Sequence, residues 1–216
     1  ASFFAQPLVY PVFSDIVYDF YPDAGTTGAT VDGRVLYANA ANFATAPDAA
    51  AGTAPNATGG YLLIENGEDV GGACDIFTMT RVFTPFDTSA IAAGSDVASA
   101  TYSAFIDVWS NTDNGEKAYY GVYTTTQTPT QLANADYDLV NATLQGKELR
   151  FTGQGTTEYT DWTIDATGTP NISKTGITLF GMSTGWDAEN KAWGCGTQNN
   201  ISMYFADNGV EGDDTK

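Results

Sequence analysis

The sequence predicts an all-β protein: a jelly-roll-type β-sandwich with an extended N-terminal arm. Two observations carry this prediction. Short segments rich in aromatic and β-branched residues recur along the chain, and turn-forming residues separate them. The chain also holds 23 glycines, and no repeat of solenoid or propeller period is present. We expect an arm at residues 1–14 followed by a single domain at residues 15–216.

The arm is apolar and interrupted by Pro7 and Pro11, which exclude a helix interior and favour extended chain. Residues 15–20 fit the first strand of the domain. A free apolar arm would be an exposed liability, so we expect the arm to lie on a neighbouring subunit. The alternative is that it pairs within its own domain. The side chains that would make the assembly contact are Phe3, Phe4, Leu8, Val9, Tyr10, Val12 and Phe13.

The remaining strands follow from apolar runs and period-two patterns. A short helix or turn is expected near residues 136–139, and a weak helical turn near residues 40–43. Asn114 and Gly115 predict a hairpin between the strand at 98–111 and the one at 117–127. The expected strands cover residues 33–38, 61–66, 74–86, 98–111, 117–127, 147–154, 159–168, 177–182 and the stretch from 198 onward.

The charge and the missing histidines exclude several functions. The chain has 26 acidic and 8 basic residues, a net charge of −18, which disfavours nucleic acid and anionic lipid as partners. It has no histidine, which removes Ser-His-Asp and Cys-His catalysis as well as His-bearing metal sites. No apolar run is long enough for a transmembrane helix, and the start of the sequence lacks the basic region of a signal peptide.

Two kinds of covalent or metal site remain open. Cys74 and Cys195 are a candidate disulfide, with two buried thiols as the alternative. Oxygen-rich loops are candidate calcium sites, with solvated turns as the alternative, and no other cofactor is expected. The better of these loops is the C-terminal cluster of Asp207, Glu211, Asp213 and Asp214, and the other spans residues 113–116.

Three further groups of residues invite a functional interpretation. Asp87, Thr88 and Ser89 lack a base to activate the serine, so a turn after Pro85 is expected there. The tryptophans fit the core of a sandwich, but Trp186 and Trp193 flank a loop-like stretch and are the candidate exposed pair for sugar stacking. A chain this acidic offers carboxylate pairs by chance, so the group Glu148, Glu158, Asp161 and Asp165 is weak support for glycoside hydrolysis.

The segments "FYPDAG", "TRVFTPFDTSAIAAGSDVASATYSAFI", "LANADYDLV" and "WTIDATGTPNISKTGITLFGMSTGWD" resemble uncharacterised proteins of tailed-phage genomes and environmental viral contigs. Those proteins are similar to β-sandwich modules of adhesive surface proteins. The resemblance runs from about Phe20 to the end of the sequence and leaves the arm outside. In the family, a stretch like "ADNGVEGDDTK" leads into a last strand, whereas this sequence ends at Lys216. A sandwich lacking an edge strand could accept an arm from a neighbouring subunit.

The resemblance implies a non-enzymatic structural protein at the surface of a virus particle, either a capsid decoration or cement protein or a tail or fibre component. Its expected partners are copies of itself and other virion proteins, without nucleic acid or membrane insertion. Two alternatives stay open. One is a carbohydrate-binding module that recognises surface glycans, and the other is a subunit of an extracellular filament built by donated strands.

Overall fold

The computed structural model describes residues 16–23, 28–40, 43–57, 61–68, 77–111, 119–150, 157–191 and 198–204. Within these ranges the chain forms an eleven-stranded antiparallel β-structure with short helical turns, so the all-β prediction is confirmed. Residues 1–15 lie outside the described ranges. The division into an arm at 1–14 and a single domain at 15–216 therefore stays a prediction.

Strands dominate the elements, and every helix is short. The strands are β1 (Gly33–Ala40), β2 (Ala54–Asn56), β3 (Tyr61–Glu68), β4 (Phe77–Asp87), β5 (Ala100–Asn111), β6 (Tyr119–Thr125), β7 (Val140–Leu144), β8 (Leu149–Arg150), β9 (Glu158–Ile164), β10 (Ile177–Thr184) and β11 (Gln198–Tyr204). The helices are the 3-10 turns η1 (Phe43–Thr45), η2 (Asn134–Leu139) and η3 (Thr169–Asn171), and the α-helix α1 (Gly185–Ala188).

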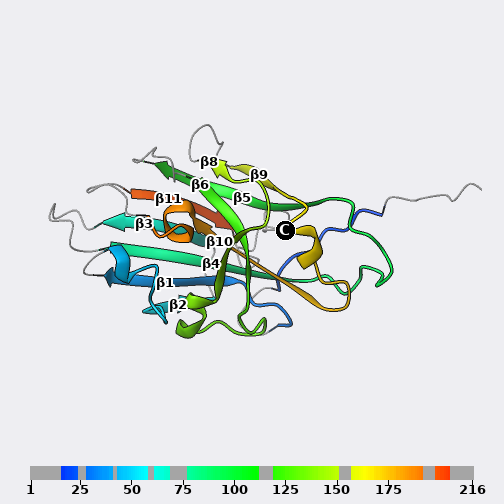
Figure 1. Ribbon diagram of the computed structural model, residues 1–216, viewed down its shortest axis with the longest axis horizontal. Coiled ribbons are helices and arrows are strands. Elements are labelled where there is room, and N and C mark those ends of the chain that lie inside the picture. The colour runs from blue at the N-terminus through cyan, green and yellow to red at the C-terminus, as the bar shows by residue number, and fades with distance from the viewer. Residues whose placement is uncertain are drawn as a thin grey trace, which may run out of the picture.

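The strands form two layers that share β4. One layer has the order β2-β1-β4-β10-β6-β7, and the other has the order β3-β11-β5-β9. The strands run roughly along the long axis of the molecule, with β1 and β2 on one side and β8 and β9 on the other (Figure 1). All strand pairs are antiparallel. The result is a β-sandwich-like structure.

Strand β4 is where the sheet divides. One edge of β4 pairs with β1 from Phe77 to Phe83. Its other edge pairs with β3 at residues 77–79 and with β10 at residues 82–87. Thr80 and Arg81 therefore lie at the point where the two layers separate. Because β4 is covered on both faces, residues 79–86 are all buried.

A short segment closes the structure on the side opposite β4. Gly146 bridges Ile164 at the end of β9, and the Lys147 N–H donates to the Thr163 carbonyl at 3.0 Å. The neighbouring Gln145 N–H donates to the Val122 carbonyl of β6 at 2.9 Å. Residues 145–147 thus connect the two layers by backbone hydrogen bonds.

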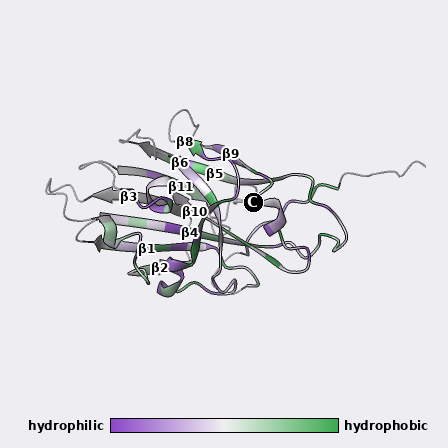
Figure 2. Ribbon diagram, in the orientation of Figure 1, coloured by the Kyte–Doolittle hydropathy of each residue, from purple (hydrophilic) through white to green (hydrophobic). Residues whose placement is uncertain are grey.

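The main core lies between the layers. It joins Met79, Val82 and Phe86 of β4 to residues of both layers. Tyr102 of β5 contacts the rings of Phe86 and Trp162 edge-on, and its hydroxyl lies 3.0 Å from Thr84 Oγ1. A second, smaller cluster of Val35, Phe83 and Tyr137 packs on the outer face of β4. Hydrophilic residues, drawn purple in Figure 2, occur within the strands as well as in the loops.

Most expected strands exist, but two local predictions are wrong. Residues 16–20 form no strand: residues 16–19 are exposed, and Phe20 packs against the core through its side chain without strand pairing. The hairpin expected from Asn114 and Gly115 is also absent among the described strands: β5 pairs with β9 and β11, whereas β6 pairs with β7, β8 and β10. Both edges of each of these strands are paired with other strands, which overrides the local turn signal.

The other elements largely agree with the sequence. Helix η2 spans the expected short helix and begins two residues earlier. The expected weak helical turn is found slightly later, as η1. Strand β8 begins two residues later than expected, and the remainder of that expected strand, from residue 151, lies outside the described residues.

The closure at Gly146 leaves no space for a side chain. A Cβ at this position would lie 2.0 Å from the Thr163 carbonyl oxygen. We expect Gly146→Ala to lower the free energy of unfolding by about 1–3 kcal/mol through overpacking. Gly94→Ala is the matched control, because a Cβ there meets nothing within 4 Å. Urea unfolding curves measure both, and equal stability of the two variants would contradict the role of the closure.

Candidate functional site

The most connected polar group in the described residues is the Arg81 guanidinium. Arg81 sits on β4 at the division of the sheet, with an exposed fraction of 7%. Its side chain shares the outer face of β4 with Phe83, beneath a cover formed by η2, α1 and the turn after η1. A buried cation in this position needs partners, because desolvation without them is costly.

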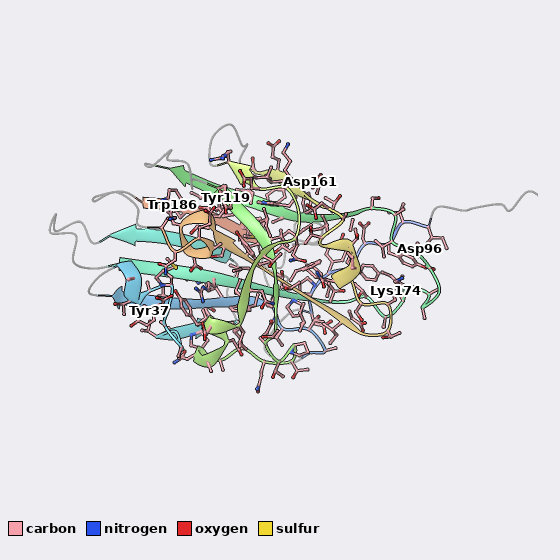
Figure 3. The ribbon with its side chains drawn as sticks, viewed as in Figure 1. Tyr37, Asp96, Tyr119, Asp161, Lys174 and Trp186 are labelled. Atoms are coloured by element: carbon pink, nitrogen blue, oxygen red, sulfur yellow. The ribbon has the colours of Figure 1, made fainter. Side chains whose placement is uncertain are left out.

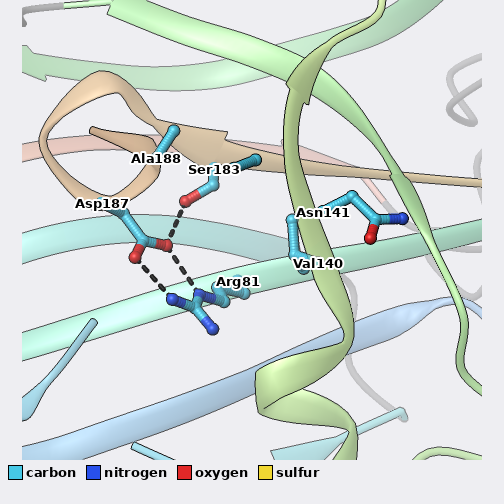
Figure 4. Close-up of a pocket in the computed structure, with 7 residues that line it drawn as sticks. Arg81, Val140, Asn141, Ser183, Asp187 and Ala188 are labelled. Carbon is cyan, nitrogen blue, oxygen red and sulfur yellow. Dashed lines mark hydrogen bonds and ion pairs between the residues drawn. The ribbon is translucent and has the colours of Figure 1, made fainter. Parts of the chain in front are cut away.

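Three distant segments supply those partners. Figure 4 shows the contact of Arg81 with one of them, at Asp187. Arg81 Nε donates to Asp187 Oδ2 at 2.7 Å, and Nη2 donates to Asp187 Oδ1 at 2.6 Å. Nη1 donates to the Tyr137 carbonyl at 2.6 Å, and Nη2 also donates to the Pro47 carbonyl at 2.8 Å. The guanidinium also lies 4.2 Å from the centre of the Tyr137 ring, within cation–π range. The paired geometry with Asp187 is the bidentate arrangement that makes Arg–carboxylate pairs strong.

Asp187 is held in place by the end of β10. Thr184 caps α1, and its hydroxyl accepts the Asp187 N–H at 3.3 Å. The Ser183 hydroxyl donates to Asp187 Oδ2. Both carboxylate oxygens therefore accept hydrogen bonds from the protein, which leaves Asp187 little capacity to act on a ligand.

The surroundings of Arg81 keep its guanidinium protonated. Burial alone would lower the pKa of Arg81, but the charge and hydrogen bonds of Asp187 outweigh it and raise that pKa. Burial, followed by the nearby Asp187 charge, raises the pKa of the Tyr137 hydroxyl. That hydroxyl donates to the Ala46 carbonyl at 2.8 Å. Tyr137 therefore stays neutral and connects η2 to the turn after η1.

A second tyrosine, Tyr119 of β6, shows a similar effect of burial on its pKa. The Tyr119 hydroxyl donates to Glu189 Oε1 at 3.0 Å. Burial raises the pKa of Tyr119 to about 12. Figure 3 shows Tyr119 and Trp186 close together, far from Asp96 and Lys174 at the other end of the molecule.

The cavity beside this centre is small. It has a volume of about 70 Å³ and is lined by Arg81, Ser183, Asp187, Ala188 and the first three residues of β7. Ligand sites typically offer roughly 300–1,000 Å³. A wider depression of about 240 Å³ lies at the far end, between Asp96, Val97, Thr169, Pro170 and Lys174. Neither cavity has the size of a typical substrate site, and the Arg81 centre is best understood as a structural connection.

A different kind of site lies where the chain enters the body. Ile16 and Val17 are 66% and 85% exposed, and Tyr18 and Tyr21 are 42% and 41% exposed. Phe20 alone in this stretch packs against the main core. The Tyr18 and Phe20 rings stack at 5.7 Å. The approach segment, residues 16–21, thus presents apolar side chains to solvent next to the predicted arm.

The Asp87, Thr88, Ser89 stretch is a corner, as predicted. The Ser89 N–H donates to Asp87 Oδ1 at 3.0 Å, which is an Asx turn. These hydrogen bonds from Ser89 lower the pKa of Asp87. The Thr88 hydroxyl donates to the Ser173 carbonyl at 2.7 Å and so joins this corner to the loop before β10.

The prediction that Trp186 is exposed for sugar stacking is wrong. Trp186 is 3% exposed and belongs to the main core, because α1 turns its ring inward. Trp162 is also buried, and its Nε1 donates to the Tyr120 carbonyl at 3.2 Å. The side chain of Trp193, the other candidate platform, lies outside the described residues.

Three of the four carboxylates considered for glycoside hydrolysis have structural partners. Asp161 accepts a hydrogen bond from the Ser103 hydroxyl at 2.6 Å, and Asp165 accepts the Thr167 N–H at 2.7 Å. Glu148 pairs with Arg150 at 3.0 Å on the surface. Within the described ranges, no three acidic or cysteine side chains gather in a way that could hold a metal ion.

Several predicted sites fall outside the described residues and stay predictions. These are the assembly side chains of the arm, the candidate disulfide of Cys74 and Cys195, the loop at residues 113–116, and the candidate calcium ligands Asp207, Glu211, Asp213 and Asp214.

Comparison with known proteins adds no assignment. No protein-family model matches the sequence, and a search of curated proteins finds no significant match. Among the described residues, no helix has the length and apolar character that crossing a membrane requires.

Sequence reasoning missed the Arg81–Asp187 pair. The two residues are 106 positions apart, so no local pattern links them. A partial signal exists for each residue. Arg81 interrupts a strongly apolar strand in a chain with only 8 basic residues, and Thr184 stands three residues before Asp187 as a capping pair. Neither signal identifies the partner.

Arg81→Met tests the importance of this pair. Removing the cation leaves the buried Asp187 carboxylate without its partner, so we expect a loss of about 3–5 kcal/mol in the free energy of unfolding. The double variant Arg81→Met/Asp187→Leu should lose less than the sum of the two single variants. Arg150→Met, which breaks the exposed pair with Glu148, is the control and should cost less than about 1 kcal/mol. Urea unfolding measures the two single variants, the double variant and the control. A cost for Arg81→Met as small as that of Arg150→Met would disprove the structural role of the Arg81–Asp187 pair.

Proposed function

We propose that this protein is a non-enzymatic structural component of a virus particle, a capsid decoration or cement protein or a tail or fibre component. It assembles as a homo-oligomer through its N-terminal arm at the virion surface. The virion location rests on the resemblance of four segments to phage-encoded proteins. The assembly mechanism rests on the residues that follow the arm.

The main observation in support of assembly through the arm is the exposure of the approach segment. Ile16 and Val17 are 66% and 85% exposed, although both are apolar, and only Asp15 separates them from the apolar arm. Apolar side chains that are contiguous and exposed mark interaction sites on soluble proteins. Phe20 anchors the approach segment to the core, while Ile16 and Val17 before it stay exposed.

The charge distribution supports the same proposal. The chain carries a net charge of −18, so two copies repel each other over most of their surfaces. No charged side chain occurs from Ser2 to Ser14. Burying this neutral segment against a neighbour gains apolar area without desolvating a carboxylate.

We also infer that the sandwich is a jelly roll. With the usual strand letters B to I, a jelly roll has one sheet in the order B-I-D-G and another in the order C-H-E-F. The orders β2-β1-β4-β10 and β3-β11-β5-β9 match these two sheets if β1 takes the place of strand I and precedes β2 in the chain. Strands β6 to β8 then form an insertion that extends the first sheet.

The two alternatives have less support. For the carbohydrate-binding alternative, one of the two candidate stacking residues is removed, because Trp186 is buried in the core. An extracellular filament would use the same arm, and differs by forming open polymers in place of closed oligomers. A glycan array and the mass distribution of the purified protein distinguish these functions from the proposed one.

The variant Leu8→Ser/Tyr10→Ser/Val12→Ser tests assembly in the full chain. Loss of apolar area should leave this variant monomeric at concentrations where the wild type is oligomeric, and the circular dichroism of both should agree. Val108→Ser, at an exposed apolar residue of β5 outside the arm, is the control and should assemble normally. Size exclusion with light scattering measures the masses. Assembly of the triple variant like the wild type would overturn the proposal.

The virion location needs a separate measurement. Mass spectrometry of purified particles from a host that produces them should detect the protein at a fixed copy number relative to the major capsid protein. Its absence from such particles would contradict a virion role and leave the assembly mechanism standing.

A further inference from the structure

We propose that β7 is the acceptor edge for the arm of a second copy, which adds to it as an extra strand. This inference rests on the proposed function and names the surface that the arm contacts. Strand addition uses backbone hydrogen bonds for affinity, so it requires an unpaired edge that can accept a neighbour.

The described sheet edges differ in how they are protected. Natural edge strands avoid pairing by shortness, by proline or by charge. Strand β2 has three residues and includes Pro55. Strand β9 carries Glu158 and Asp161. The end of β9 is also occupied by the bridge to Gly146. Strand β7 contains neither proline nor charge.

Strand β7 is also loosely attached and exposed. It pairs with β6 at Leu144 and Val140, opposite Tyr123 and Thr125. Three residues of β7 therefore stand opposite one residue of β6, which is a bulge that bends β7 outward. The three bulged residues, Asn141, Ala142 and Thr143, are all exposed.

Two details limit how much of β7 can pair. The Thr143 carbonyl already accepts a hydrogen bond from Gln145 Nε2 at 2.7 Å. A bulge itself shortens the stretch available for pairing. The cavity of about 70 Å³ lies between the start of β7 and α1, so this part of β7 is not tightly packed against its neighbours. A short added strand fits this edge.

The arm has the pattern of a strand that pairs along one edge. In an extended chain, successive N–H groups point to opposite edges, so the odd-numbered residues share one edge and the even-numbered residues share the other. Pro7 and Pro11 are both odd-numbered. Their missing N–H groups fall on the same edge, which is where proline is tolerated in an edge strand. Residues Gln6, Leu8, Tyr10 and Val12 keep all their N–H groups on the other edge, available to β7.

A second copy, and not the same chain, is the expected acceptor of each arm. Ile16 and Val17, which stand closest to the arm among the described residues, are 66% and 85% exposed and so make little contact with their own body. Both the arm and β7 are uncharged in a protein of net charge −18. Their contact joins two acidic copies where carboxylate repulsion is weakest.

Paired variants test strand addition by light scattering in the full-length protein. Leu8→Pro removes an N–H directed at β7 and should raise the dissociation constant at least ~10-fold, whereas Val9→Pro removes one on the opposite edge and should change it less than ~3-fold. Ala142→Lys places a charge on β7 and should weaken assembly by a similar factor. Thr101→Lys is its control, because Thr101 is exposed on β5 and adds the same charge.

Mixing separates exchange between copies from pairing within one chain. Leu8→Pro/Tyr10→Pro has a defective arm and an intact β7, and Ala142→Lys has the reverse. Each alone should be monomeric, and an equal mixture should form a 1:1 complex. Absence of that complex, or equal effects of Leu8→Pro and Val9→Pro, would overturn strand addition to a second copy. The proposed function is tested separately by Leu8→Ser/Tyr10→Ser/Val12→Ser. If that variant loses assembly, the arm mediates assembly even where strand addition to β7 is overturned.

Discussion

The structure depends on one buried cation. Arg81 lies where β4 passes from pairing with β3 to pairing with β10, and its guanidinium binds Asp187, Tyr137 and Pro47 from three separate segments. These contacts hold α1, η2 and the turn after η1 on the outer face of the shared strand. A buried arginine with its full set of partners is stable in place, and the loss of one partner is costly. The pair therefore fixes which segments cover β4.

This arrangement explains where the protein has capacity for binding and where it has none. The carboxylate of Asp187 is used by Arg81 and Ser183, and the adjacent cavity is small. The opposite side is closed by backbone hydrogen bonds at Gly146. The described groups that remain open to a partner are peripheral: the apolar approach segment and the uncharged edge of β7. These are the groups on which the proposed structural role rests.

The sequence predicts local features of this protein well and distant ones poorly. Alternating β-branched and aromatic residues locate the strands, and Asp87 before Ser89 locates a turn, because these signals depend on neighbours in the chain. The prediction of a hairpin at Asn114 is wrong because strand partners are determined by packing across the sandwich. The prediction that Trp186 is exposed is wrong because α1 turns its ring into the core. The Arg81–Asp187 pair spans 106 positions, and no spacing rule connects such residues.

The most direct test of this account is hydrogen–deuterium exchange followed by mass spectrometry, above and below the assembly concentration. Backbone amides in residues 79–86 of β4 should exchange slowly in both states, because the Arg81 connection belongs to the single chain. Amides in residues 140–144 should exchange at least ~10-fold more slowly in the assembled state alone, since an added strand protects them there. Equal exchange of residues 140–144 in both states would contradict the account.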